Sequence, residues 1–242
     1  MKQKILLVLF IVSLQHTVFS QSQFSGWLAS FNTFKTGKKT SIHFDAQLRS
    51  SDEFKQVQTL LLRPGINFHV RKNITLTAGY AFIANRYRLG GITDMAIEHR
   101  IWEQVLINQK IKKITLAHRF RMEQRFLPKL TIENGDLAAD GHNVMLGRLR
   151  YFARGILPLT KTEGSFARGP FVALQNEVFV NIFNKDKVNG KFFDQNRAYL
   201  AMGYRLNPKA DLEIGYLNQY VNGAGNAFTN NHVVQVAGYL RL

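Results

Sequence analysis

The fold is decided by a stretch in which polarity changes at every second residue: Ile114-Thr115-Leu116-Ala117-His118-Arg119-Phe120-Arg121-Met122-Glu123-Gln124-Arg125-Phe126. Side chains on a β-strand point alternately to opposite faces, so a strand here is apolar on one face and charged on the other. Similar runs recur up to residue 242. A water-soluble sandwich seldom lines one face with so many arginines, whereas an outer-membrane barrel turns apolar residues to lipid and polar residues to its lumen. The pattern predicts an all-β fold, an antiparallel transmembrane β-barrel of the outer membrane.

The N-terminal sequence also indicates a protein exported to the outer membrane. Lys2 and Lys4 precede an apolar stretch over residues 5–14, and Val18-Phe19-Ser20 offers a cleavage site. The apolar stretch is too short to span a bilayer, so residues 1–20 are predicted to be a cleaved signal peptide. We therefore expect the protein in the outer membrane of a Gram-negative bacterium. Residues 21–38 form an N-terminal segment or first strand, and residues 39–242 form the barrel.

Composition limits the function further. Without residues 1–20, 30 basic and 16 acidic residues remain, a net charge of +14. A basic cytosolic protein would suggest nucleic acid, but here the arginines alternate within strands of a secreted chain, so no nucleic acid is expected. The chain has no cysteine, which excludes disulfides, a lipid-anchored cysteine and thiolate metal sites. We expect no cofactor and no metal.

Ten strands are predicted at residues 39–50, 56–70, 74–85, 96–110, 114–126, 143–157, 171–183, 196–206, 210–221 and 232–242. A further strand-like stretch covers residues 24–34. Short and long connections alternate, as in bacterial barrels with short periplasmic turns and long outer loops. This places the C-terminus in the periplasm, although the long connection 158–168 breaks the rule. An eleventh strand conflicts with the even counts of bacterial barrels, so we expect ten to twelve strands.

The lumen holds the strongest candidates for function. The inward register contains the predicted lumen charges Arg119, Arg121, Glu123, Arg125, Arg148, Arg150, Glu177, Arg197 and Arg205. One interpretation is a narrow, anion-tolerant path for small anionic solutes. The other is an ion-pair network that fills a plugged structural barrel, because a true aqueous channel needs about sixteen strands.

Two alternatives remain open. An outer-membrane enzyme acting on lipid would use His43 or His69, which take inward registers, but no serine with a nucleophile-like context stands near either in sequence. We assign no catalytic residue. A surface-binding barrel would instead use the outer loops predicted at residues 86–95 and 127–142. Four tyrosines, Tyr80, Tyr204, Tyr216 and Tyr239, are predicted on the lipid-facing side, as in the aromatic girdles of barrels.

Several strand-shaped motifs carry a resemblance to a known family. They are Arg121-Met122-Glu123-Gln124-Arg125-Phe126, Arg148-Leu149-Arg150-Tyr151, Asn176-Glu177-Val178-Phe179-Val180-Asn181, Asp194-Gln195-Asn196-Arg197-Ala198-Tyr199 and Leu212-Glu213-Ile214-Gly215-Tyr216-Leu217-Asn218-Gln219-Tyr220. In their order, over roughly residues 24–242, they resemble the secreted, barrel-forming group known as domain of unknown function 2490. The resemblance implies an outer-membrane barrel and carries over no activity. The expected partners are outer-membrane lipids, including lipopolysaccharide, and the barrel-assembly machinery, and the expected state is a monomer.

Overall fold

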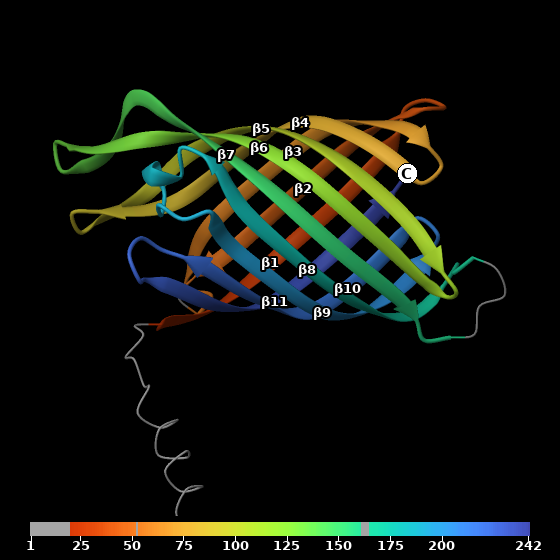
Figure 1. The fold of residues 1–242 in the computed structure, drawn as a ribbon. Helices are drawn as coiled ribbons and strands as arrows, with labels where there is room; N and C mark the ends of the chain where they lie inside the picture. Colours follow the sequence, from red (N-terminus) through yellow and green to blue (C-terminus); the bar gives the residue numbers. More distant parts are fainter. Residues whose placement is uncertain (1–19, 52, 161–164) are drawn as a thin grey trace, which may run out of the picture.

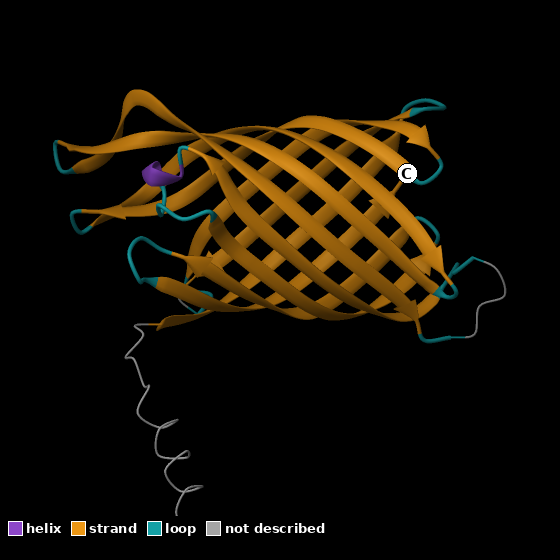
Figure 2. Ribbon diagram, in the orientation of Figure 1, coloured by secondary structure: helices purple, strands orange, loops and turns teal. Residues whose placement is uncertain are grey.

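The computed structural model describes residues 20–51, 53–160 and 165–242. In this part of the chain eleven strands close into a barrel (Figure 1). They are β1 (Ser20–Lys35), β2 (Thr40–Ser51), β3 (Gln56–Arg71), β4 (Ile74–Leu89), β5 (Ile92–Ile111), β6 (Ile114–Glu133), β7 (Asp136–Pro158), β8 (Gly169–Phe183), β9 (Phe193–Asn207), β10 (Ala210–Asn222) and β11 (Phe228–Arg241). One short 3-10 turn, η1 (Lys185–Lys187), lies between β8 and β9, and strands make up nearly all of the rest (Figure 2). The predicted all-β barrel of ten to twelve strands is confirmed. Except for Ser20, the expected signal peptide lies outside the described residues.

Within the described ranges, no helix is long and apolar enough to cross a membrane.

The odd strand number is accommodated at one seam. Each strand pairs antiparallel with its neighbours in sequence, but β1 and β11 pair parallel, from Ser20↔Phe228 to Thr33↔Arg241. The stretch predicted at residues 24–34 is therefore the strand that closes the barrel. The expectation of an even number assumed that the first and last strands meet antiparallel, and a parallel pair removes that requirement.

The two ends of the barrel differ. The end with the turns after β3, β5 and β9 also holds the C-terminus, and we call it the short-turn end (Figure 1). The opposite, long-hairpin end carries the extended β4–β5 and β6–β7 hairpins and η1. The long connection between β7 and β8 lies at the short-turn end, and its Phe166 packs edge-on against Phe171 with ring centroids 6.1 Å apart.

The two long outer loops predicted at residues 86–95 and 127–142 are not loops. They are continuations of the strand pairs β4–β5 and β6–β7, joined by two-residue turns at Gly90-Gly91 and Asn134-Gly135. All four turn residues have positive φ, between 53° and 89°. Such turns match the twist of a two-stranded ribbon, so the ladder continues to its tip. The sequence contained the Asn-Gly signal, and Leu130, Ile132, Leu137 and Ala139 share one face of the β6–β7 ribbon, but the glycine and acidic residues clustered at 133–142 are also typical of a loop.

The outer surface of the barrel is apolar along its length. Ile66, Leu174 and Met202 are each more than 60% exposed, and the outward positions of every strand continue this pattern. The polar residues on this face are paired across strands: Gln124 donates to Glu103 (3.2 Å), and Asn176 donates to Asn196 (3.1 Å). Such pairing gives these side chains hydrogen-bond partners within the apolar face.

One of the four tyrosines predicted on the lipid-facing side lies inside the barrel instead. Tyr239 points inward, stacks on Phe31 with ring centroids 4.9 Å apart, and donates a hydrogen bond to Glu213 (2.7 Å). Alternation is ambiguous on β11 because its inward side is also apolar. There Val233 and Ala237 are fully buried, and Val233 belongs to a cluster with Trp27 and Tyr199.

Inward glycines make room for aromatic rings. Gly65 and Gly79 are register partners on β3 and β4, and Trp102 lies over both. A Cβ atom on Gly79 would lie 2.5 Å from the Trp102 ring and 2.4 Å from the Pro64 carbonyl oxygen. Trp102 is fully buried and its indole N–H donates to the Tyr80 carbonyl (3.1 Å). The position of the Trp102 ring therefore requires glycine at residues 65 and 79.

We expect Gly79→Ala to destabilise the barrel by about 1–3 kcal/mol, because the added methyl group forces Trp102 or the β3 backbone to move. Gly155→Ala is the matched control, since its Cβ would meet only Ile114, at an ordinary 3.8 Å. The measurement is denaturant unfolding of both variants, with folded and unfolded protein separated by heat-modifiable gel mobility. Equal stabilities for the two variants would contradict the role assigned to Gly79.

Candidate functional site: the arginine-rich lumen

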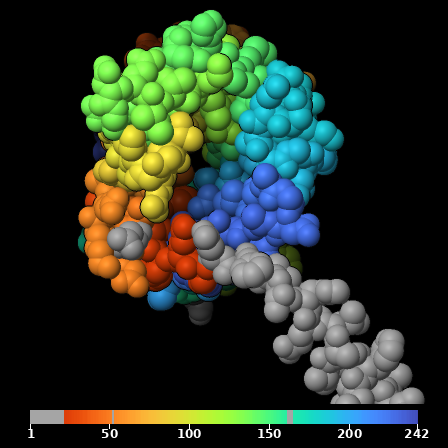
Figure 3. Space-filling view, turned by 90° about the vertical axis from the view of Figure 1, so that its left-hand side faces the viewer, coloured from red at the N-terminus to blue at the C-terminus, as the bar shows by residue number. Residues whose placement is uncertain are grey.

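The lumen contains a cavity of about 320 Å³ to which all eleven strands contribute lining residues. Among the described lining residues are nine arginines and two glutamates. A view onto the long-hairpin end shows the surface hollowed at its centre (Figure 3). Alternation brings this charge together, because strands with inward arginines are adjacent around the wall. The cavity is therefore strongly basic.

Glu123 is the central carboxylate of the lumen. It is 1% exposed and lies 2.7 Å from Arg148, 2.5 Å from Arg150, 3.4 Å from Arg100 and 3.9 Å from Arg63. These arginines come from β3, β5 and β7, so one side chain on β6 joins three other strands. A buried carboxylate needs such compensation, because leaving one charge unpaired in a poorly hydrated interior is costly.

Two further carboxylates extend this cluster. Glu98 lies 2.6 Å from both Arg100 and Arg125, and Glu177 lies 2.7 Å from both Arg119 and Arg150. Each glutamate thus holds two arginines. Guanidinium groups suit this sharing because each presents five donors in a planar fork.

The ion pairs of the cluster join six of the nine predicted lumen charges, namely Arg119, Glu123, Arg125, Arg148, Arg150 and Glu177, and all nine face inward. Arg119, Arg125, Arg148, Arg150, Glu177 and Arg197 line the cavity. Arg121 and Glu123 are buried behind it, with Arg121 stacked on Trp102 at 4.5 Å and bonded to Gln104. Arg205 lies apart at the short-turn end, where it pairs with Asp211 (2.7 Å) and donates to the Phe166 carbonyl (2.9 Å).

The predicted lumen charges omit four of the lining arginines, Arg49, Arg63, Arg100 and Arg154. Arg154 pairs with Glu213 at 2.5 Å. It stands four residues after Arg150 on the same face, so extending the alternation along β7 finds it. Arg49 likewise shares the inward register of β2 with Gln47, but nothing in the sequence distinguishes it from the other inward charges.

The histidines do not form a hydrolytic site. His69 Nε2 lies 2.9 Å from Ser41 Oγ, but its Nδ1 faces the Thr75 hydroxyl at 3.1 Å. A hydroxyl does not stabilise an imidazolium as a carboxylate does, and Ser41 is only 1% exposed. His43 packs edge-on against Trp102 with ring centroids 5.6 Å apart. Within the described ranges, no group of three histidine or carboxylate side chains is arranged to hold a metal ion.

The comparisons with known proteins give a family and one distant relative. The family described as "protein of unknown function (DUF2490)" matches residues 24–230. An uncharacterized protein of Methylorubrum extorquens is similar, with 26% identity over 200 residues that cover 81% of this chain and 78% of the relative. No solved structure matches the chain.

We expect Glu123→Gln to cost about 3–5 kcal/mol of stability, because four arginines lose their shared counter-charge. Glu53→Gln is the control, since Glu53 lies in the exposed turn between β2 and β3 with its side chain 72% exposed. Urea unfolding of the two variants measures the difference. A Glu123→Gln barrel as stable as the control would show that the cluster does not hold the wall together.

Proposed function

The chain belongs to the DUF2490 family of proteins of unknown function, and from the chemistry of its two surfaces we propose that it is an outer-membrane β-barrel whose lumen admits small anions from the long-hairpin end. The observation that carries the proposal is the charge of the cavity, where nine arginines face two glutamates. A lumen lined by one sign of charge raises the local concentration of the opposite ion.

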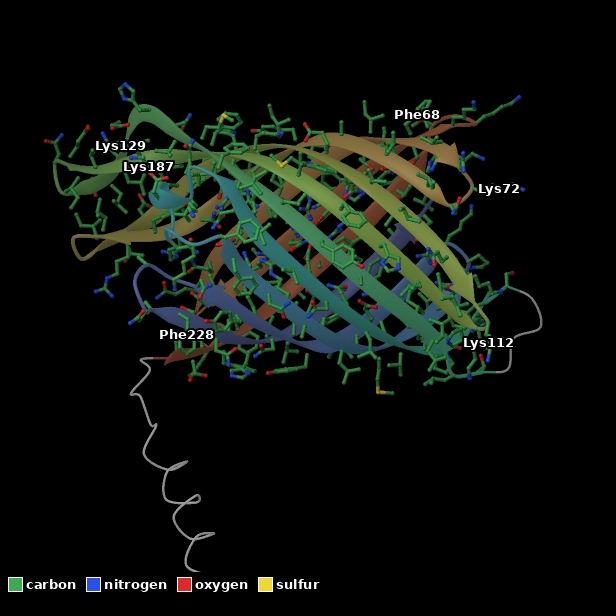
Figure 4. All side chains as sticks on the ribbon, in the orientation of Figure 1. Phe68, Lys72, Lys112, Lys129, Lys187 and Phe228 are labelled. Carbon is green, nitrogen blue, oxygen red and sulfur yellow. The ribbon has the colours of Figure 1, made fainter. Side chains whose placement is uncertain are left out.

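The outer surface supports insertion in a membrane. Apolar side chains cover the wall, and the thirteen described lysines lie in turns or in the end parts of strands. Lys72 and Lys112 lie at the short-turn end and Lys129 and Lys187 at the long-hairpin end (Figure 4). Lysines at both rims fit contact with lipid phosphates, whereas the positive charge of the lumen is entirely arginine. Outer-membrane lipids, lipopolysaccharide among them, are therefore the proposed surroundings.

The orientation follows the usual rule that short turns face the periplasm. On that rule the long-hairpin end, with the hollow, faces outward, and small anionic solutes arrive from the cell exterior. The Glu123 cluster then narrows the lumen further inside. We propose no enzymatic role, because the buried serine and histidine have no carboxylate to orient them.

Tryptophan fluorescence tests whether the lumen admits anions. Trp27 lines the cavity, while Trp102 is fully buried. We expect iodide to quench the folded protein in detergent several-fold more strongly than caesium, because the arginines attract the anion. Trp27→Phe is the control that identifies the reporter, and it should abolish the difference.

A double variant tests the role of the arginines. Arg119→Gln with Arg125→Gln removes two lining charges, yet Glu177 keeps Arg150 and Glu98 keeps Arg100. The preference for iodide should fall while the barrel stays folded. Equal quenching by both ions, or quenching by neither, in the wild-type protein would rule out an anion-admitting lumen.

A further inference from the structure

Two arginines of the cavity wall stand out because no described carboxylate lies within ion-pair distance of them. Of the nine described arginines that line the cavity, seven have a carboxylate within 4.0 Å, whereas Arg49 and Arg197 have none. Arg49 donates to the side-chain oxygen of Gln47 (3.2 Å from Nε and 2.5 Å from Nη2). Arg197 donates from Nε to the side-chain oxygen of Gln195 at 3.2 Å. These neutral acceptors orient each guanidinium without cancelling its charge.

Both arginines lie against the same ring. The Arg49 Cζ is 4.0 Å and the Arg197 Cζ 5.1 Å from the centroid of Trp27. Arg49 is the direct register partner of Trp27 on β2, whereas Arg197 reaches the ring from β9. The two Cζ atoms are thus at most 9.1 Å apart, the sum of these distances. A guanidinium carbon lies about 4 Å from the central atom of an oxyanion that it binds, so bridging requires the two carbons to be about 8 Å apart or less, a separation within the limit set by their shared ring.

Like charges this close in a restricted space are unfavourable unless an anion lies between them. Stacking on an aromatic ring contributes only about 0.5–2 kcal/mol and leaves the net charge in place. The seven other lining arginines show how this chain compensates the same cost elsewhere, namely with glutamate or aspartate. Arg49 and Arg197 lack such a partner among the described residues.

A neighbouring cavity indicates what the anion is attached to. A space of about 610 Å³ at the long-hairpin end shares Trp27, Arg49 and Thr59 with the lumen cavity. Hydroxyl and amide side chains dominate its wall, among them Ser25, Gln58 and Asn231. Such groups donate and accept hydrogen bonds in the pattern that hydroxyl-rich molecules need, and an aromatic ring such as Trp27 offers an apolar face to a sugar.

We propose that Arg49, Arg197 and Trp27 form a binding site for the terminal oxyanion of a hydroxyl-rich small molecule, a sugar phosphate or a sugar acid. The uncharged body of the ligand lies in the outer cavity and its anionic group lies between the two arginines. This proposal rests on the proposed function, because the ligand enters through an anion-admitting lumen.

The test is isothermal titration of the full-length protein, folded in detergent, with glucose 6-phosphate, glucuronate, glucose and inorganic phosphate. We expect one of the two anionic sugars to bind more tightly than glucose and than inorganic phosphate, and the tighter one identifies the head group. Arg49→Gln and Arg197→Gln should each weaken that binding about tenfold or more, as expected for loss of a charge-assisted hydrogen bond. Arg49→Lys should restore only part of it, because lysine lacks the guanidinium fork.

Arg88→Gln is the matched control, an exposed arginine in the β4–β5 hairpin outside both cavities. Heat-modifiable mobility of each variant shows that it is folded. Affinities unchanged in Arg49→Gln and Arg197→Gln would overturn the site, as would glucose or phosphate binding as tightly as the anionic sugars. Failure of both anionic sugars to bind the wild-type protein also overturns it. If neither anionic sugar binds but iodide still quenches the same sample more strongly than caesium, the sugar site is wrong and the proposed function stands. If iodide and caesium quench equally, the proposed function is wrong as well.

Discussion

The structure depends on pairing the charges that a closed barrel forces inward. A strand that turns apolar residues outward must turn its other face into the lumen, where few waters fit and unpaired charges are costly. Glu123 forms ion pairs with four arginines on three strands. Glu98 and Glu177 pair with further arginines on either side of this group. In a soluble sandwich, apolar packing between two sheets joins opposite walls. Here ion pairs link strands up to three positions apart around the wall, helped by aromatic rings such as Trp102 that lie over glycines.

The parallel seam between β1 and β11 connects closure with the candidate site. Trp27 belongs to the closing strand and packs with Val233 of β11 in a buried cluster. Its other neighbours, Arg49 and Arg197, come from β2 and β9, on either side of the seam. These three side chains meet only after the first and last strands have paired. The seam therefore both completes the wall and assembles the most basic unpaired part of the lumen.

Much of this fold was accessible from the sequence because alternation reports which face each residue takes. The barrel, its approximate strand number and the inward direction of all nine predicted lumen charges follow from that period. The pattern fails at Tyr239, which lies on a strand with apolar residues on both sides, and in the β6–β7 hairpin, where glycine and acidic residues typical of loops interrupt a ribbon that is still apolar on one face. Ion-pair partners were beyond reach as well, because Arg148 and Glu123 meet through a strand register that no local pattern specifies. For the same reason the sequence did not separate Arg49 and Arg197 from the paired arginines.

The carboxylate partners of the lining arginines indicate which of these arginines stabilise the barrel wall. If the inward charges served only to hold the wall, each lining arginine would need a carboxylate, and seven of the nine have one. The two that do not are both beside Trp27, and Arg49 also lines the outer cavity at the long-hairpin end. A surplus scattered through the lumen would suggest incomplete pairing. Arg121, buried behind the wall, also lacks a described carboxylate within 4.0 Å, but it bonds to Gln104 and stacks on Trp102. On the cavity wall itself the surplus is confined to the ring of Trp27, next to a cavity lined mainly by hydroxyl and amide groups. The paired arginines fit a structural role in the wall, and in the proposed function the two unpaired ones bind the solute.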